Sequence, residues 1–93
     1  MRQSEAERRG LKPLARIVAT AAHAHEPAYF TTAPVPAMRK VVERAGWTID
    51  QVDLWEINEA FAVVPMIAIK ELGLSHDKVN VNGGACALGH PIG

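Results

Sequence analysis

The sequence has little of several features that mark particular classes of protein. It holds one cysteine among 93 residues, which excludes an internal disulfide and is typical of a protein of the reducing cytoplasm. No apolar run reaches the roughly 18 residues of a membrane span, and the charged N-terminus is unlike a secretory signal. Ten basic and ten acidic residues give a formal net charge of zero, which argues against nucleic acid or an anionic membrane as a partner.

The hydrophobic periodicity predicts helices and strands in alternation. With 48% hydrophobic residues and no repeat, the chain is expected to be globular, and its length allows at most one small domain. Helices are expected at 3–9, 36–45 and 59–72, a mostly buried strand at 14–25, two further strands at 53–58 and 79–82, a loop at 26–35 and a turn at 49–52. A glycine follows each expected helix as a cap, whereas Pro65 should kink the third helix or delay its start. This order predicts an α/β fold with a mixed sheet.

Both ends of the sequence look like cuts through a longer protein. The chain begins inside an expected helix, and Pro91 suits the first turn of a helix that does not follow. Three strands need covering helices on both faces of their sheet, and the helices expected here are too few. We therefore expect an internal segment of a larger protein, stable only against the remainder.

Two polar residues are candidates for a functional site. Asn58 stands at the junction of an expected strand and helix, where α/β folds place ligands, although an asparagine there can also simply cap the helix. His90 lies in a glycine-rich loop, where it can titrate near neutral pH or merely bond to the backbone of the turn. Because each follows an expected strand or its loop, we expect the two side chains to approach one another, within reach of a shared water.

The motifs around these residues resemble those of the thiolase family. They are Asn58-Glu59-Ala60-Phe61-Ala62, the stretch VNVNGGA at 79–85 and the stretch GHPIG at 89–93, in the order and spacing that the family has. The likeness is to thiolases of the acetyl-CoA acetyltransferase type, the bacterial β-ketothiolases. It implies that residues 1–93 are the front portion of the family's C-terminal domain, with part of its layered α-β-α fold.

The resemblance implies chemistry on acyl-CoA thioesters. Thiolases join or split these thioesters by Claisen chemistry, and the CoA thioesters are substrates, with no cofactor or metal. By resemblance, His90 activates a nucleophilic cysteine and helps to hold the thioester oxygen, and Asn58 positions a water beside it in an oxyanion hole. Hydrogen-bond donors held in place around a developing oxyanion strongly lower the activation free energy. Ala60 and Phe61 match positions that line the pantetheine channel.

The resemblance also implies partners and limits. The partners are acyl-CoA substrates, the rest of the thiolase chain and further copies in a homodimer or homotetramer, with no nucleic acid and no membrane. Neither of the family's two catalytic cysteines is matched in this sequence, so the segment alone is expected to be inactive. Two alternatives stay open, a non-catalytic acyl-CoA-binding module and a structural fragment.

Cys86, the single cysteine, invites a different assignment. It precedes His90 in the same loop, and a Cys/His pair would serve as a nucleophile and its base. Thiolases usually carry an aliphatic residue at this place, so we favour Cys86 as a small hydrophobic core residue. A metal at His23 and His25 is not expected, because no carboxylate or cysteine accompanies them closely. The basic side chains of one expected helix are interpreted as a solvated face: Arg39, Lys40 and Arg44.

Overall fold

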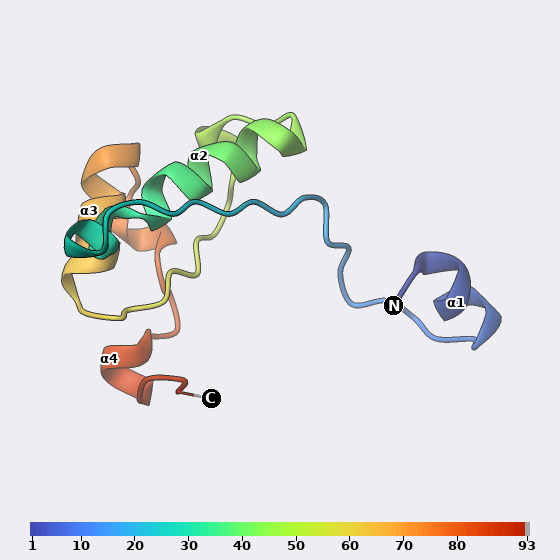
Figure 1. Cartoon of the computed structure of the whole chain (residues 1–93). Helices are drawn as coiled ribbons and strands as arrows, with labels where there is room; N and C mark the ends of the chain where they lie inside the picture. The colour runs from blue at the N-terminus through green and yellow to red at the C-terminus, as the bar shows by residue number, and fades with distance from the viewer. Residues whose placement is uncertain (93) are drawn as a thin grey trace.

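The computed structural model describes residues 1–92, whose regular secondary structure is helical apart from one isolated β-bridge. The helices are α1 (Gln3–Arg8), α2 (Pro34–Ala45), α3 (Val63–Leu72) and α4 (Ala85–Leu88). Three 3-10 turns stand between them, η1 (Pro27–Thr32), η2 (Ile49–Gln51) and η3 (His76–Lys78). Figure 1 shows α2, α3 and α4 together in one body, with α1 apart from it at the end of an extended segment. None of the described helices is long and apolar enough to cross a membrane.

Proline and glycine set the two ends of α2. Pro34 stands in its first turn, where a missing N–H loses no intrahelical hydrogen bond. The helix ends at Ala45 because Gly46 takes a left-handed conformation, with a φ of 72° that glycine adopts without a steric cost. The predicted end is confirmed, and the helix starts at Pro34 rather than at the predicted Pro36.

Pro65 delays the start of α3. The helix begins at Val63 rather than at the predicted Glu59, which puts Pro65 in its first turn. A proline deeper in the helix would remove a hydrogen bond and clash with the preceding turn. The predicted delay is therefore confirmed, and residues 59–62 form a loop that leads into the helix.

One cluster of buried hydrophobic side chains holds the body together. Helices α2 and α3 pack against each other, and the chain segments around Trp55 and Val79 complete the cluster. The members are Val35, Val42, Trp55, Ile57, Val64, Ala68, Leu72 and Val79. This packing brings the segment before Asn58 next to the segment before the glycine-rich loop.

The predicted sheet is reduced to one parallel bridge in the described residues. Trp55 pairs with Val79, since the Trp55 N–H donates to the Lys78 carbonyl at 2.8 Å and the Asn80 N–H donates to the Trp55 carbonyl at 2.9 Å. The third predicted strand is wrong beyond Val79, because Asn80 turns the backbone into the left-handed region with a φ of 47°. No mixed sheet forms within residues 1–92.

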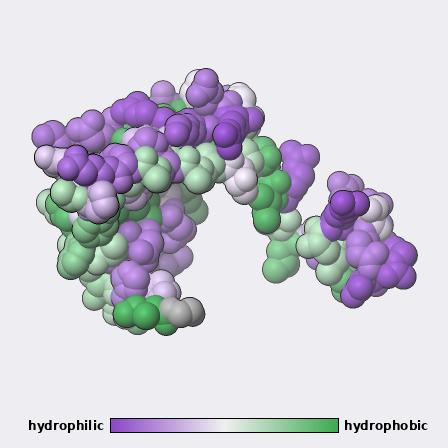
Figure 2. Space-filling model, viewed as in Figure 1, coloured by the Kyte–Doolittle hydropathy of each residue, from purple (hydrophilic) through white to green (hydrophobic). Residues whose placement is uncertain are grey.

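Residues 11–26, which we call the arm, do not form the strand that was predicted within them. The mostly buried strand expected over 14–25 is wrong here, because the backbone runs without regular secondary structure and Ile17 is 86% exposed. An extended segment becomes a strand only when a partner strand offers its hydrogen bonds, and the one bridge in the described chain lies elsewhere. Figure 2 shows hydrophobic surface along the arm between α1 and the body.

The basic side chains of α2 bind other segments. Arg44 donates from Nη1 to the Thr20 carbonyl at 2.7 Å, and Lys40 Nζ lies 3.1 Å from Nδ1 of His23. Arg39 donates to a carbonyl at the end of α3. These side chains are exposed, as expected for a solvated face, and two of them also hold the arm beside α2.

Candidate active site

Asn58 and His90 lie side by side. The Nδ2 atom of Asn58 is 3.3 Å from Nε2 of His90, although the two residues are 32 positions apart in the sequence. An amide nitrogen can only donate, so Nε2 of His90 is the acceptor in this contact. Both residues are exposed and can therefore meet a ligand. The predicted approach of the two side chains is confirmed.

The side chain of Asn80 holds the residue that precedes Asn58. Its Oδ1 accepts the Ile57 N–H at 2.8 Å, and its Nδ2 donates to the Ile57 carbonyl at 2.9 Å. The backbone of Asn80 leaves the strand direction at this point, so its amide makes the pair of bonds that a further strand residue would have made. The parallel pairing is extended in this way as far as the edge of the site.

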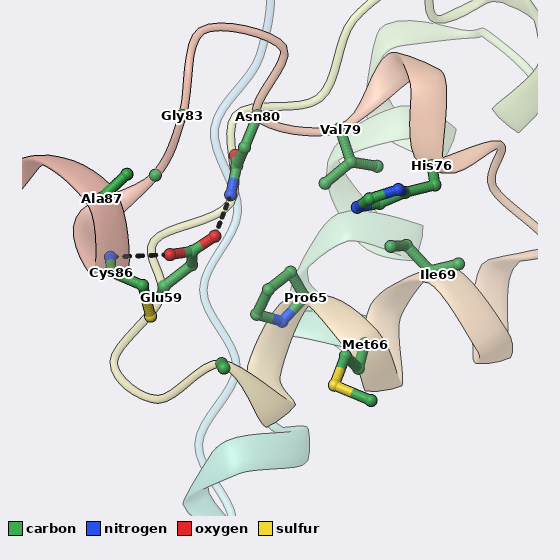
Figure 3. A pocket seen from close by; sticks show the side chains of 12 residues that line it. Glu59, Pro65, Met66, Ile69, His76, Val79, Asn80, Gly83, Cys86 and Ala87 are labelled. Carbon is green, nitrogen blue, oxygen red and sulfur yellow. Dashed lines mark hydrogen bonds between the residues drawn. The ribbon is translucent and has the colours of Figure 1, made fainter.

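Glu59, directly after Asn58, reaches across to the glycine-rich loop. Its Oε2 accepts the Cys86 N–H at 2.7 Å, and its Oε1 accepts from Nδ2 of Asn80 at 3.2 Å (Figure 3). The Cys86 N–H, followed by the Cys86 thiol and the Asn80 amide, holds the pKa of Glu59 below its ordinary value. The carboxylate is therefore ionised at neutral pH.

Gly84 leaves the space that this carboxylate occupies. A Cβ atom at position 84 would lie 2.5 Å from both Cδ and Oε1 of Glu59 and 2.8 Å from Nδ2 of Asn80. The backbone φ of Gly84 is −107°, which any residue can adopt. Its lack of a side chain thus serves the close approach of Glu59 rather than a turn.

A cavity of about 340 Å³ lies between α3 and the glycine-rich loop (Figure 3). Its apolar wall comes from α3, with Pro65, Met66 and Ile69, and its polar wall from Glu59 and Asn80. The Asn58 and His90 side chains are not part of this lining. The cavity is the space around the Glu59 contacts, beside the Asn58–His90 pair.

A second cavity, of about 320 Å³, has Asn58 and Ala60 in its wall. Phe30 from η1 lines it as well, and Phe61 lies outside the lining but packs edge-on against Phe30, with ring centroids 6.1 Å apart. Phe61 is 60% exposed. The structure thus brings Ala60 to the same hollow as Asn58 and places Phe61 at its margin.

Cys86 is neither a core residue nor the partner of His90. The favoured prediction of a buried hydrophobic residue is wrong, because Cys86 is exposed. It lies on the single turn of α4, a helix too short to bury its side chains against the body. Hydrogen bonding to the Glu59 carboxylate, then partial desolvation and the charge of Glu59, raise the pKa of the Cys86 thiol. A raised pKa disfavours the thiolate that a nucleophile requires.

His23 and His25 lie next to each other in the arm, and no group of three or more His, Cys, Asp and Glu side chains suited to a metal ion is found in the described part of the chain. Their rings pack edge-on with centroids 5.2 Å apart. Partial desolvation, followed by the charges of Lys40 and His25, lowers the pKa of His23. His25 Nε2 lies 2.8 Å from the Tyr29 carbonyl, so this ring closes the η1 turn.

The sequence reasoning missed three residues of the site. These are Glu59, Asn80 and Gly84, which bind or accommodate one another around the Glu59 carboxylate. One signal was available, since asparagine tolerates the left-handed conformation that Asn80 takes, and the Asn82-Gly83 pair shortly after it favours a turn. Nothing in the sequence pattern indicated that Glu59 would bond to that turn.

Known proteins match this chain over its whole length. Residues 11–93 match the family profile described as thiolase, C-terminal domain. The chain is 55% identical to the cytosolic acetyl-CoA acetyltransferase of Mus musculus and 53% identical to the acetyl-CoA acetyltransferase of Shinella zoogloeoides, over 93 residues in both. These alignments cover 100% of this chain, which spans 23% and 24% of the two relatives.

A solved structure agrees with these matches. The crystal structure of the Bacillus anthracis acetyl-CoA acetyltransferase superposes with a TM-score of 0.93 at 46% sequence identity, covering 99% of this chain and 23% of that one. The profile match over most of the chain and this superposition lead to the same conclusion: the chain belongs to the thiolase family.

Proposed function

We propose that this chain is part of an acetyl-CoA C-acyltransferase, in which Asn58 and His90 belong to the active site. The intact enzyme catalyses reversible Claisen condensation or thiolytic cleavage of acyl-CoA thioesters. The observation that carries this proposal is the 3.3 Å contact between Asn58 and His90, which joins two motifs of the thiolase family. The names of the two relatives above, both acetyl-CoA acetyltransferases, support the same reaction.

The two residues have complementary roles in this proposal. His90, as a neutral imidazole, takes the proton of the nucleophilic thiol and then presents an N–H to the thioester oxygen. Asn58 holds a water beside the same oxygen. Thioester enolates and tetrahedral intermediates concentrate charge on that oxygen, so donors already in place there stabilise the transition state more than the ground state.

Ala60 and Phe61 are proposed to bind the substrate. Ala60 shares a cavity wall with Asn58, and Phe61 adds an exposed apolar ring beside it. Small and apolar side chains suit the thin pantetheine arm of coenzyme A. Coenzyme A enters this scheme as part of the substrate, and the reaction needs no other cofactor and no metal.

The rest of the thiolase chain is proposed as the partner that completes the fold. The chain spans 23% of the mouse relative, and the arm exposes apolar side chains such as Leu14 and Ile17. We propose that residues 1–93 form part of a C-terminal domain, that the arm pairs as a strand in a layered α-β-α sheet, and that the enzyme is a cytoplasmic homodimer or homotetramer. It has no nucleic-acid or membrane partner in this scheme.

A chimaeric enzyme tests the proposal. In the chimaera, this chain replaces the matching 93 residues of the mouse acetyl-CoA acetyltransferase. We expect it to fold and to cleave acetoacetyl-CoA with added CoA, because the chain supplies the two residues proposed for the active site, in contact with each other. A folded chimaera without turnover, beside an active mouse parent, would contradict the proposal.

Glu59→Gln in the chimaera should speed alkylation of Cys86. The carboxylate raises the pKa of this thiol, so the neutral amide should lower that pKa and increase the thiolate fraction at any pH below it. The pH profile of iodoacetamide labelling, read by peptide mass spectrometry, should move to lower pH. Glu71→Gln, on the far end of α3, should leave the profile unchanged. A Glu59→Gln profile that stays in place or moves upward would disprove the assigned cause.

A further inference from the structure

The geometry points to Glu59 as a positioning residue that fixes Asn58 and His90 relative to each other. Its carboxylate ties the loop that carries Asn58 to the turn that leads into His90. The inference rests on the proposed function, because it concerns the reactivity of that pair.

The first contact fixes the His90 side. Oε2 of Glu59 accepts the N–H of Cys86 at 2.7 Å, in the only turn of α4 (Figure 3). His90 lies just beyond this short helix, so the position of α4 decides where the imidazole stands. A hydrogen bond to an ionised carboxylate is stronger than a neutral one, which suits a segment with little other support.

The second contact fixes the Asn58 side. Nδ2 of Asn80 donates both to Oε1 of Glu59 at 3.2 Å and to the Ile57 carbonyl at 2.9 Å. Asn58 therefore lies between Ile57 and Glu59, and the side-chain amide of Asn80 binds both of them. A rotation of the chain at either neighbour would carry the Asn58 side chain away from the imidazole.

The third observation is the space at position 84. Gly84 has an ordinary backbone conformation, yet a Cβ there would lie 2.5 Å from Cδ of Glu59. Alanine at this position would force the carboxylate to move without straining the turn itself. Glu59 and Gly84 thus form one fitted contact, and each offers a separate way to disturb it.

Glu59→Gln in the chimaera should lower kcat for acetoacetyl-CoA thiolysis by roughly 10- to 100-fold, since a small displacement of a reacting group has this effect. The amide keeps the size of the side chain but turns an NH₂ group toward one of two donors. KM should change little, because the Glu59 side chain acts on the pair through Asn80 and Cys86 and is absent from the wall of the cavity that Asn58 and Ala60 line. Gly84→Ala should lower kcat in the same way, and Glu71→Gln should match the parent.

A double-mutant comparison separates positioning from a general loss of structure. If Glu59 acts through Asn58, the substitution Glu59→Gln should lower kcat much less in an Asn58→Ala background than in the parent. Equal losses in both backgrounds would overturn the inference. Folded Glu59→Gln and Gly84→Ala variants with parental kcat would also overturn the inference about Glu59. If Asn58→Ala and His90→Ala were impaired in the same experiment, the proposed function would still hold. Full activity of those last two variants would instead overturn the proposed function itself.

Discussion

The His90→Ala variant of the chimaera should cleave acetoacetyl-CoA about 10²–10⁴-fold more slowly than the parent, the usual effect of removing a general base. His90 is also expected to donate to the thioester oxygen, so the loss should lie toward the upper end of that range. The two losses need not multiply, because residues that act as a unit are not additive. The measurement is kcat for thiolysis, with folding checked by thermal melting.

Cys86→Ala is the matched control for this prediction. Cys86 is exposed and its thiol makes no hydrogen bond to His90 in the described residues, so turnover should stay near the parental value. A substitution at an exposed position typically changes stability by no more than about 0.5 kcal/mol. A Cys86→Ala variant that is folded but inactive, beside an active His90→Ala variant, would reverse the assigned roles.

The isolated chain should show no thiolase turnover. The thiol of its single cysteine has a pKa raised by Glu59, which disfavours the thiolate that a nucleophile requires, and the family's two catalytic cysteines are not matched in these 93 residues. Acetoacetyl-CoA cleavage by the purified chain should therefore remain at the rate of a protein-free blank. Cleavage that disappears with Cys86→Ala would identify Cys86 as the nucleophile and contradict this account.

The isolated chain should also fold poorly. The arm leaves apolar side chains exposed, among them Leu14 and Ile17, and the body has one small cluster of buried residues. Chains with so little buried surface are marginally stable. Thermal melting followed by circular dichroism should be broad, whereas the chimaera should melt cooperatively. A sharp, cooperative transition of the isolated chain would show that the body is sufficient by itself.

Features set by local chemistry could be predicted from the sequence. The ends of α2 and α3 follow from Gly46 and Gly73, which take positive φ angles, and the delayed start of α3 follows from Pro65. The strands could not be predicted in the same way. Whether the arm forms a strand depends on a partner, and no local pattern distinguishes a paired from an unpaired extended segment.

The candidate active site also has features that the sequence could predict and features that it could not. The approach of Asn58 and His90 could be predicted because both belong to motifs of one family and each follows an expected strand or its loop. The exposure of Cys86 could not, since it depends on the short α4 helix, which no periodicity indicated. The contacts of Glu59 join residues 21 and 27 positions apart and became evident only in three dimensions.

The most direct test of the central claim, that Asn58 and His90 act together on one oxyanion, is a double-mutant cycle in the chimaera. The quantity is kcat for acetoacetyl-CoA thiolysis by the parent, Asn58→Ala, His90→Ala and the double variant, each verified as folded. We predict that both single variants are slow and that the double variant is no slower than His90→Ala alone, because in the proposed mechanism the water held by Asn58 acts together with the imidazole. Losses that multiply, or an Asn58→Ala variant with parental kcat, would contradict the account.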